Sequence, residues 1–241
     1  MYNEPDFNPD FFSKEIKNQL KQKINNLWPD LNNLSLLNLG YAANCFPINK
    51  DESSFSITGH FHSNIQSYDS EISPICRISP KAFPFQDRFF DRILYIHDGL
   101  ICKNKFASLL RSCWETLRDS GKFILLLPNS LSWCFFKKLS LGFDNNGFYF
   151  PTLKKMLKQQ MFRICYSERI LFLPSSIMNL FSSRVNQIVE TIGQSLIPFL
   201  GGFHLIEVEK DLYATIPLDV IKRRYLVPQK LFLNLRKDDP A

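Results

Sequence analysis

The chain has 241 residues, of which 45% are hydrophobic and 22% charged, so it can bury one sizeable core and is not a disordered protein. No apolar run reaches the roughly 18 residues of a membrane span, and the N-terminus lacks a basic segment followed by an apolar one; we therefore expect a soluble, cytoplasmic protein without a secretory signal. The net charge of +6 is uneven, since residues 221–241 hold six Lys and Arg against two Asp, which favours a weak contact with an acidic partner or a membrane surface, or simply a solvated terminus.

The first half of the chain predicts a helix followed by short strands. Apolar residues recur at steps of three and four between residues 11 and 27, which is the spacing of one helical face. "SLLNLG" (35–40) then reads as a buried strand that ends in a glycine turn. "SFSITG" (54–59) and "PICRIS" (74–79) are the next two candidate strands.

The middle of the chain predicts a parallel strand–helix–strand unit. "RILYIH" (92–97) is a candidate central strand, and residues 104–117 carry apolar residues on one helical face. After a turn expected at Gly121, "FILLL" (123–127) is a strictly apolar strand that Pro128 stops. Strands that are apolar on both faces are typical of parallel sheets covered by helices, so the sequence predicts a doubly wound α/β fold.

The last part predicts a helix over 150–162, a strand over 163–174, a helical stretch over 176–200 and a final strand over 203–216. We expect a single domain over 1–220, with a helical insertion at about 175–200 and a basic tail over 221–241. The apolar stripe of the insertion packs on the core in the simplest interpretation; a lid or an amphipathic surface helix are the alternatives.

Six cysteines are widely spaced, without a C-x-x-C pair and without histidines at zinc-binding distance in sequence. No cue pairs any of them with a base. The sequence therefore predicts ordinary reduced cysteines and no metal site.

Three ordered segments make the pattern specific: "LLNLGYA" (36–42), "AFPFQDRFFDRILYIHDGL" (82–100) and "LLRSCWETLRDSGKFILLLPN" (109–129). Together they resemble class I S-adenosylmethionine-dependent methyltransferases. The chain is most similar to the type 11-like subgroup of alphaproteobacteria, through "LWPDL" (27–31), "LGYA", "LPN" (127–129) and the E-x-x-K-x-x-Y segment at 207–213. The resemblance implies a mostly parallel, seven-stranded Rossmann-like sheet and S-adenosylmethionine as the cofactor.

The cofactor loop is degenerate. Gly40 stands where a sharp turn lets the cofactor approach the backbone. The family pattern has an acidic residue where this chain has Asn38, and further glycines where it has Ala42 and Asn44. Ala adds one methyl group and Asn tolerates left-handed backbone, so the loop could still close around a ligand.

Two acidic anchors of the family are also absent. An acid after the second strand binds both ribose hydroxyls, and this chain has Gly59 and His60 there; an acid after the third strand contacts the adenine, and Ser79 stands in its place. The subgroup also lacks the second-strand acid. The resemblance implies the following cofactor-binding residues: Gly40, Tyr41, Ala42, Gly59, His60, Ser79, Phe83, His97 and Asp98.

Candidate reactive groups follow the fourth and fifth strands. His97 could orient a substrate or act as a base, because an ordinary histidine titrates near neutrality, but it could equally cap the strand end. Asp98 is either a cofactor contact or a helix cap. Asn129 and Trp133 lie where α/β sheets bind ligands, so we consider them for substrate binding, with packing as the alternative.

Three functions remain open from the sequence. The first is a methyltransferase that acts on an unidentified acceptor. The second is a catalytically inactive methyltransferase-fold protein that serves as a binding or scaffold module, which the lost glycines and acids favour. A nucleic-acid or membrane-surface binder is the third, although no nucleic-acid-binding motif supports it.

Overall fold

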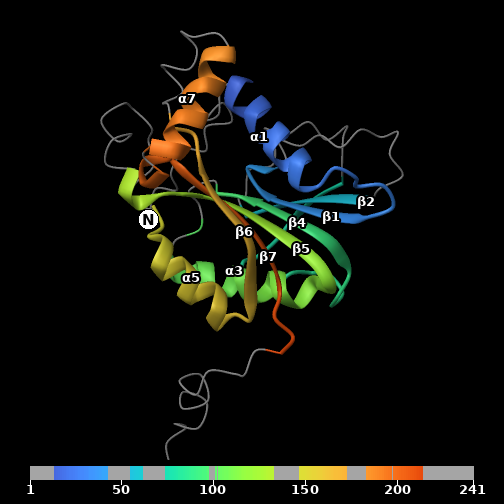
Figure 1. Cartoon of the computed structure of the whole chain (residues 1–241). Coiled ribbons are helices and arrows are strands. Elements are labelled where there is room, and N and C mark those ends of the chain that lie inside the picture. Colours follow the sequence, from blue (N-terminus) through green and yellow to red (C-terminus); the bar gives the residue numbers. More distant parts are fainter. Residues whose placement is uncertain are drawn as a thin grey trace, which may run out of the picture.

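The computed structural model describes residues 14–42, 55–61, 74–97, 101, 103–132, 147–172, 183–196 and 198–213 (Figure 1). Its elements, in chain order, are α1 (Lys14–Leu27), β1 (Ser35–Gly40), β2 (Phe55–His60), β3 (Ile75–Arg77), β4 (Phe90–Ile96), α3 (Lys103–Thr116), β5 (Leu117–Pro128), α5 (Phe150–Gln159), β6 (Phe162–Ile170), α7 (Ser183–Leu196), the 3₁₀ helix η1 (Pro198–Leu200) and β7 (Phe203–Lys210).

The strands form one seven-stranded sheet in the order β3-β2-β1-β4-β5-β7-β6. The first five strands pair in parallel, and β7 is antiparallel to both of its neighbours, β5 and β6. This topology confirms the predicted doubly wound, mostly parallel Rossmann-like sheet. The chain winds outward from β1 to β3 on one side and from β4 to β5 on the other, so the order reverses between β1 and β4.

Helices cover both faces of the sheet (Figure 1). Alternate residues of β1 serve opposite layers: Leu36 packs in a cluster with Leu20 and Ile24 of α1, whereas Leu37 and Leu39 belong to the cluster of α3 and α5. The period-2 alternation of a strand, buried on both sides, explains why these strands read as continuous apolar runs.

Two distant segments meet on the α1 face of the sheet. The indole Nε1 of Trp28 donates a hydrogen bond of 2.8 Å to Oε1 of Glu207, which is 4% exposed. Nζ of Lys122 lies 3.2 Å from the other oxygen of Glu207, and the guanidinium of Arg92 lies 5.7 Å from the Trp28 ring centroid. The "LWPDL" segment and the segment at 207–213 therefore contact each other directly.

Several predicted boundaries are wrong. β5 already begins at Leu117, immediately after α3, because Leu117 pairs with Phe90 beyond a register shift in the β4–β5 ladder; no turn at Gly121 separates helix and strand. β6 ends at Ile170 and β7 at Lys210, several residues before the predicted ends at 174 and 216. Residues 11–13, 173–182 and 214–241, with the basic tail, lie outside the described residues.

The core-facing interpretation of the insertion stripe is also wrong for its described part. Val185, Ile188, Ile192 and Leu196 of α7 are exposed, with Leu196 reaching 73%, and Val189 is half-buried. Most of the described stripe is therefore open to solvent, so α7 is an amphipathic surface helix. The remaining stripe residues Ile177, Leu180 and Phe181 lie outside the described residues. No described helix is both long and apolar enough to cross a membrane.

Candidate functional site

The carboxyl ends of β1 and β4 lie side by side where the strand order reverses. Gly40, the last residue of β1, is in register with Ile96, the last residue of β4, and the amide of Tyr41 donates to the Ile96 carbonyl at 2.9 Å. On the other side of β1, Leu39 is in register with Gly59 of β2. Open α/β sheets bind ligands at such a reversal, so the topology brings Gly40, His60 and His97 to one candidate site.

Gly40 makes the turn that leaves the sheet. Its φ of 63° lies in the left-handed region, which costs other residues about 1–2 kcal/mol. Both Gly40 and the following residues Tyr41 and Ala42 are buried. The backbone conformation at this position therefore favours glycine. Asn44, at the third glycine position of the family pattern, lies outside the described residues.

Asn38, two residues before Gly40, carries a buried acceptor that no described residue satisfies. The residue is 1% exposed, and its Nδ2 lies 3.5 Å from Oγ of Ser56, at the limit of a hydrogen bond. Within the described part of the chain, its Oδ1 makes no hydrogen bond. An unsatisfied buried acceptor costs about 1–3 kcal/mol, so this carbonyl oxygen can gain from a donor on a bound ligand.

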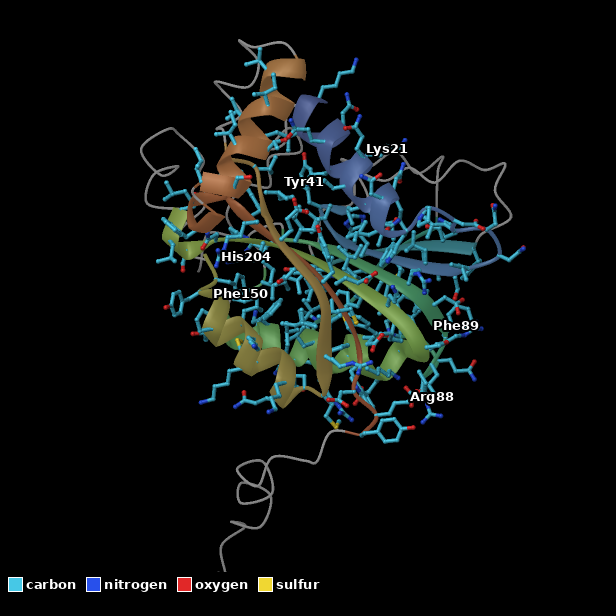
Figure 2. All side chains as sticks on the ribbon, viewed as in Figure 1. Lys21, Tyr41, Arg88, Phe89, Phe150 and His204 are labelled. Atoms are coloured by element: carbon cyan, nitrogen blue, oxygen red, sulfur yellow. The ribbon has the colours of Figure 1, made fainter. Side chains whose placement is uncertain are left out.

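Tyr41 contributes its backbone to the site, whereas its ring packs elsewhere. The side chain is 1% exposed and belongs to the α1 cluster, and Nζ of Lys17 lies 5.9 Å from the ring centroid. Figure 2 shows Tyr41 close to α1. The ring therefore secures the turn after Gly40 from the α1 side.

The end of β2 is crowded and uncharged. A Cβ at Gly59 would lie 2.6 Å from Cδ1 of Ile78 and 3.0 Å from Leu39, so the absence of a side chain at Gly59 serves strand packing. His60 is 3% exposed, and burial lowers its pKa to about 4, which keeps it neutral at pH 7. The described end of β2 thus offers a neutral imidazole where the family pattern has a carboxylate.

Ser79 and Phe83 lie on the loop after β3. Ile78 connects this loop to the site, because its amide donates to the His60 carbonyl at 2.9 Å. Ser79 is exposed, and its Oγ accepts from the amide of Lys81 at 3.4 Å. Phe83 is half-buried and packs edge-on against Phe85. Both residues closely follow the end of β3 in sequence, and neither carries charge.

His97 is enclosed. Its Nδ1 lies 2.9 Å from the Tyr95 hydroxyl, and the Phe148 ring stands perpendicular to the imidazole at 5.6 Å. The side chain is 1% exposed, and burial lowers its pKa to about 3. These contacts favour a structural role for His97 over that of a general base, but the partner of its Nδ1 is the Tyr95 hydroxyl and not the backbone that a strand cap would bind. Asp98 lies outside the described residues.

The side chain of Asn129 binds backbone groups of the chain itself. Its Nδ2 donates to the carbonyls of Phe199 at 3.1 Å and Gly201 at 2.8 Å, and its Oδ1 accepts from the amide of Leu131 at 3.1 Å. The amide group is therefore engaged in fastening the approach to β7. Trp133 lies outside the described residues.

Phe148 is a site residue that the sequence did not indicate. It contacts His97 and Phe106 with its ring, and its carbonyl lies 3.2 Å from Nε2 of His204. Phe148 and Asn129 are far apart in sequence, and an isolated β-bridge joins them in the folded chain. Nothing in the local sequence indicates that Phe148 would occupy this position.

No three His, Cys, Asp or Glu side chains of the described ranges lie close enough together to hold a metal ion. Cys113 is fully buried, and burial raises the pKa of its thiol well above the ordinary value. Such a thiol is a poor nucleophile, because the thiolate is the reactive form.

Neither a protein-family model nor a curated protein matches this chain. Solved structures share its fold. A SAM-dependent methyltransferase from Archaeoglobus fulgidus has a TM-score of 0.58 at 16% identity and covers 80% of this chain and 94% of its own. One from Mesorhizobium loti has 0.57 at 11% identity, covering 78% and 96%. The [4+2]-cyclase SpnF also has 0.57, at 10% identity and 82% of each chain. The chain therefore has the class I methyltransferase fold.

Proposed function

We propose that this protein is an S-adenosylmethionine-dependent methyltransferase with a weakened cofactor site and an unidentified acceptor. The observation that carries the proposal is the left-handed Gly40 at the sheet reversal, two residues after Asn38, whose Oδ1 no described residue satisfies. The shared fold of solved methyltransferases supports it. Membership of the alphaproteobacterial type 11-like subgroup is part of the proposal, and the Trp28–Glu207 hydrogen bond between two of its segments supports that membership.

The candidate residues fit the cofactor in part. On the β1–β4 side, the turn at Gly40 allows close approach of a ligand to the backbone, and Oδ1 of Asn38 suits a donor such as an amine. On the β2–β3 side, His60 and Ser79 replace two carboxylates. Hydrogen bonds to charged groups contribute about 1.5–3 kcal/mol each, so we expect weaker binding than two acids would give.

When bound, S-adenosylmethionine supplies a sulfonium methyl group that a nucleophile can take directly. The chain's contribution is to hold the reactants in line and to exclude water, which can provide much of the acceleration. His97 stays neutral at pH 7 and, with its pKa lowered to about 3, is too weak a base to remove a proton from a poor nucleophile. The proposed acceptor is therefore one that reacts without a strong base from this residue.

Isothermal titration with S-adenosylmethionine tests the proposal. We expect saturable binding with one site per chain and a Kd between about 10 μM and 1 mM, because two charged anchors are missing. S-adenosylhomocysteine, the product of methyl transfer, should compete for the same site. Absence of heat for both compounds up to millimolar concentration would contradict cofactor binding.

The substitution His60→Asp is expected to strengthen that binding about tenfold or more. It restores a carboxylate at the end of β2, which can accept hydrogen bonds from both hydroxyls of a ribose. His60→Asn is the matched control, because it supplies an uncharged acceptor of the same size and should give a smaller gain. Titration of both variants, with melting curves to verify folding, checks the result; an intact His60→Asp variant with unchanged affinity would place the ribose elsewhere.

A non-catalytic binding module is the second candidate function. The crowding of Gly59 by Ile78, the enclosed His97 and the lost acids favour it. The fold also occurs in the [4+2]-cyclase SpnF, so the fold alone does not fix the reaction. A folded chain that binds neither S-adenosylmethionine nor S-adenosylhomocysteine would favour this candidate.

A further inference from the structure

The described residues at the ends of β2 and β3 carry positive charge. Residues 55–61 and 74–86 include His60, Arg77 and Lys81 but neither Asp nor Glu. Burial keeps His60 neutral at pH 7, so the charge comes from Arg77 and Lys81. The family pattern has carboxylates on this side of the site, at the positions of His60 and Ser79. The charge of these two ranges is therefore reversed in sign and not merely reduced.

Arg77 stands beside His60. It is the last residue of β3 and is in register with His60, the last residue of β2. Neighbouring strands lie about 4.8 Å apart, and paired residues point to the same face of the sheet. Arg77 is exposed, and it forms no ion pair with another described residue. Its charge is therefore not neutralised within the described part of the chain.

The end of β2 belongs to the same edge as the candidate site. Phe61, directly after His60, is half-buried, and its ring packs edge-on against Tyr95 at 6.4 Å. The Tyr95 hydroxyl lies 2.9 Å from Nδ1 of His97 at the end of β4. β1, which ends at Gly40, lies between β2 and β4 in the sheet. The ends of these three strands form one edge, and β3 continues it.

The turn after β3 carries the second positive charge. The amide of Ala82 donates to the Ser79 carbonyl at 3.2 Å, which closes a tight turn around Pro80 and Lys81. Oγ of Ser112 donates to the Pro80 carbonyl at 3.2 Å and so fastens the turn to α3. Lys81 is exposed on this turn, four residues after the end of β3. Its backbone is therefore held in place while its side chain reaches solvent.

We propose that the β2–β3 end of the candidate site binds a phosphate group carried by the ribose of an adenine nucleotide, with Arg77 as its main contact and Lys81 as a second one. In nucleotide-binding α/β sheets, an acid about this position selects the free ribose hydroxyls, whereas an arginine accommodates a ribose phosphate. A guanidinium can donate two parallel hydrogen bonds to a phosphate. The inference rests on the proposed nucleoside-binding role of this edge and adds a ligand class to it: adenosine with a phosphate on its 2′ or 3′ oxygen.

Isothermal titration of the full chain with four compounds tests the inference: adenosine, adenosine 2′-phosphate, adenosine 3′-phosphate and adenosine 5′-phosphate. We expect the 2′- or the 3′-phosphate to bind at least about tenfold more tightly than adenosine and the 5′-phosphate. The 5′-phosphate is the matched control, because it has the same charge and reports any general attraction to a chain of net charge +6. Equal affinities for the three phosphates, or no binding of the 2′- and 3′-phosphates, would overturn the inference.

Two variants assign the preference for a ribose phosphate to its residues. Arg77→Gln should lower the ratio of the preferred phosphate's affinity to that of the 5′-phosphate about tenfold, and Lys81→Gln should lower it less. Lys158→Gln is the control, because this exposed lysine lies in the last turn of α5, which precedes β6 at the opposite edge of the sheet from β3. A ratio that persists in a folded Arg77→Gln variant would contradict the assignment.

The substitution His60→Asp separates this inference from the proposed methyltransferase function. A carboxylate beside Arg77 should weaken binding of the ribose phosphate, because like charges repel, while it strengthens binding of S-adenosylmethionine. A folded His60→Asp variant that binds the ribose phosphate as tightly as the natural chain would overturn the inference. Binding of S-adenosylmethionine without any preference for a ribose phosphate would refute the inference alone. The preference without binding of S-adenosylmethionine would support the inference and contradict the proposed function.

Discussion

Replacing Trp28 by alanine is expected to lower the free energy of unfolding by about 3–5 kcal/mol, the usual cost of truncating a buried aromatic side chain. The indole is 4% exposed and packs in the α1 cluster. It also donates to Glu207 and lies under the guanidinium of Arg92. Truncation would therefore leave a cavity and deprive a buried carboxylate of its nearest neutral donor.

Trp28→Phe separates these two contributions. It keeps most of the apolar volume and removes the donor to Glu207, so we expect a smaller loss of about 1–3 kcal/mol. Tyr213→Ala is the control, because that ring is 96% exposed and its removal should cost less than about 0.5 kcal/mol.

Urea unfolding followed by circular dichroism measures the stability of the Trp28 variants without relying on tryptophan fluorescence. A loss below about 1 kcal/mol in Trp28→Ala would show that α1 is only loosely attached to the sheet. Should Trp28→Ala fail to fold at all, Trp28→Phe still tests the hydrogen bond to Glu207.

The order of the elements could be predicted because buried parallel strands leave an unmistakable pattern. "FILLL" is apolar at every position and "RILYI" at every position after Arg92, and both became central strands packed on two faces. The ends of the strands could not be predicted so well. Leu117 continues the apolar face of α3 in sequence, and only its pairing with Phe90 assigns it to β5. Pairing partners far apart in sequence are invisible to local patterns.

For the candidate site, the sequence predicted the backbone turn but not the contacts of the side chains. The first predicted strand of the chain ends in a glycine, which indicates a turn at that point. In the structure Gly40 has the left-handed backbone conformation that favours glycine. Asn129 lies at the predicted edge, yet its amide binds carbonyls some seventy residues further along the chain. Burial of His97 by Phe148 likewise depends on tertiary contacts.

The apolar stripe of α7 illustrates a further limit. Helical spacing predicts that one face is apolar, but it does not say what covers that face. The simplest expectation was the core of the protein itself. In the structure Gly193 takes the inward position against Phe172, and the bulky residues Ile188 and Leu196 face outward. The smallest residue of the helix therefore lies where α7 comes closest to Phe172.

Acidification is expected to destabilise this protein well above the pH range in which carboxylates titrate. The pKa of His60 is lowered to about 4 and that of His97 to about 3 by burial; that of His204 is lowered to about 4, mainly by burial, with the Phe148 carbonyl raising it and the charge of Arg169 lowering it. In the unfolded chain each imidazole regains an ordinary value near 6.5. Between about pH 6.5 and pH 4 the unfolded state therefore binds more protons than the folded state, with a difference that approaches three near pH 5.

The sign follows from this difference. These groups have depressed folded-state values, so the stability is fully present above pH 6.5 and is lost as the pH falls towards 4. Each unfolded histidine is half protonated at pH 6.5 and almost fully protonated at pH 5, and one proton corresponds to about 1.4 kcal/mol per pH unit, so the three together should remove about 5 kcal/mol between pH 6.5 and pH 5. Asp91 adds to the loss only in stronger acid; burial raises its pKa, but the hydrogen bonds from Ser35 and Arg118 lower it by more.

Urea unfolding at pH 7, 6 and 5 measures this slope, and His204→Phe assigns part of it. His204 packs on the Phe150 ring at 5.5 Å (Figure 2), so phenylalanine can occupy its place while the titrating group is removed. The variant loses the contact with the Phe148 carbonyl at every pH, and only the slope is diagnostic. We expect the slope to fall by about one third, because one of three protons no longer distinguishes the two states. An unchanged slope would mean that His204 binds its proton equally in the folded and unfolded states, and that burial does not lower its pKa.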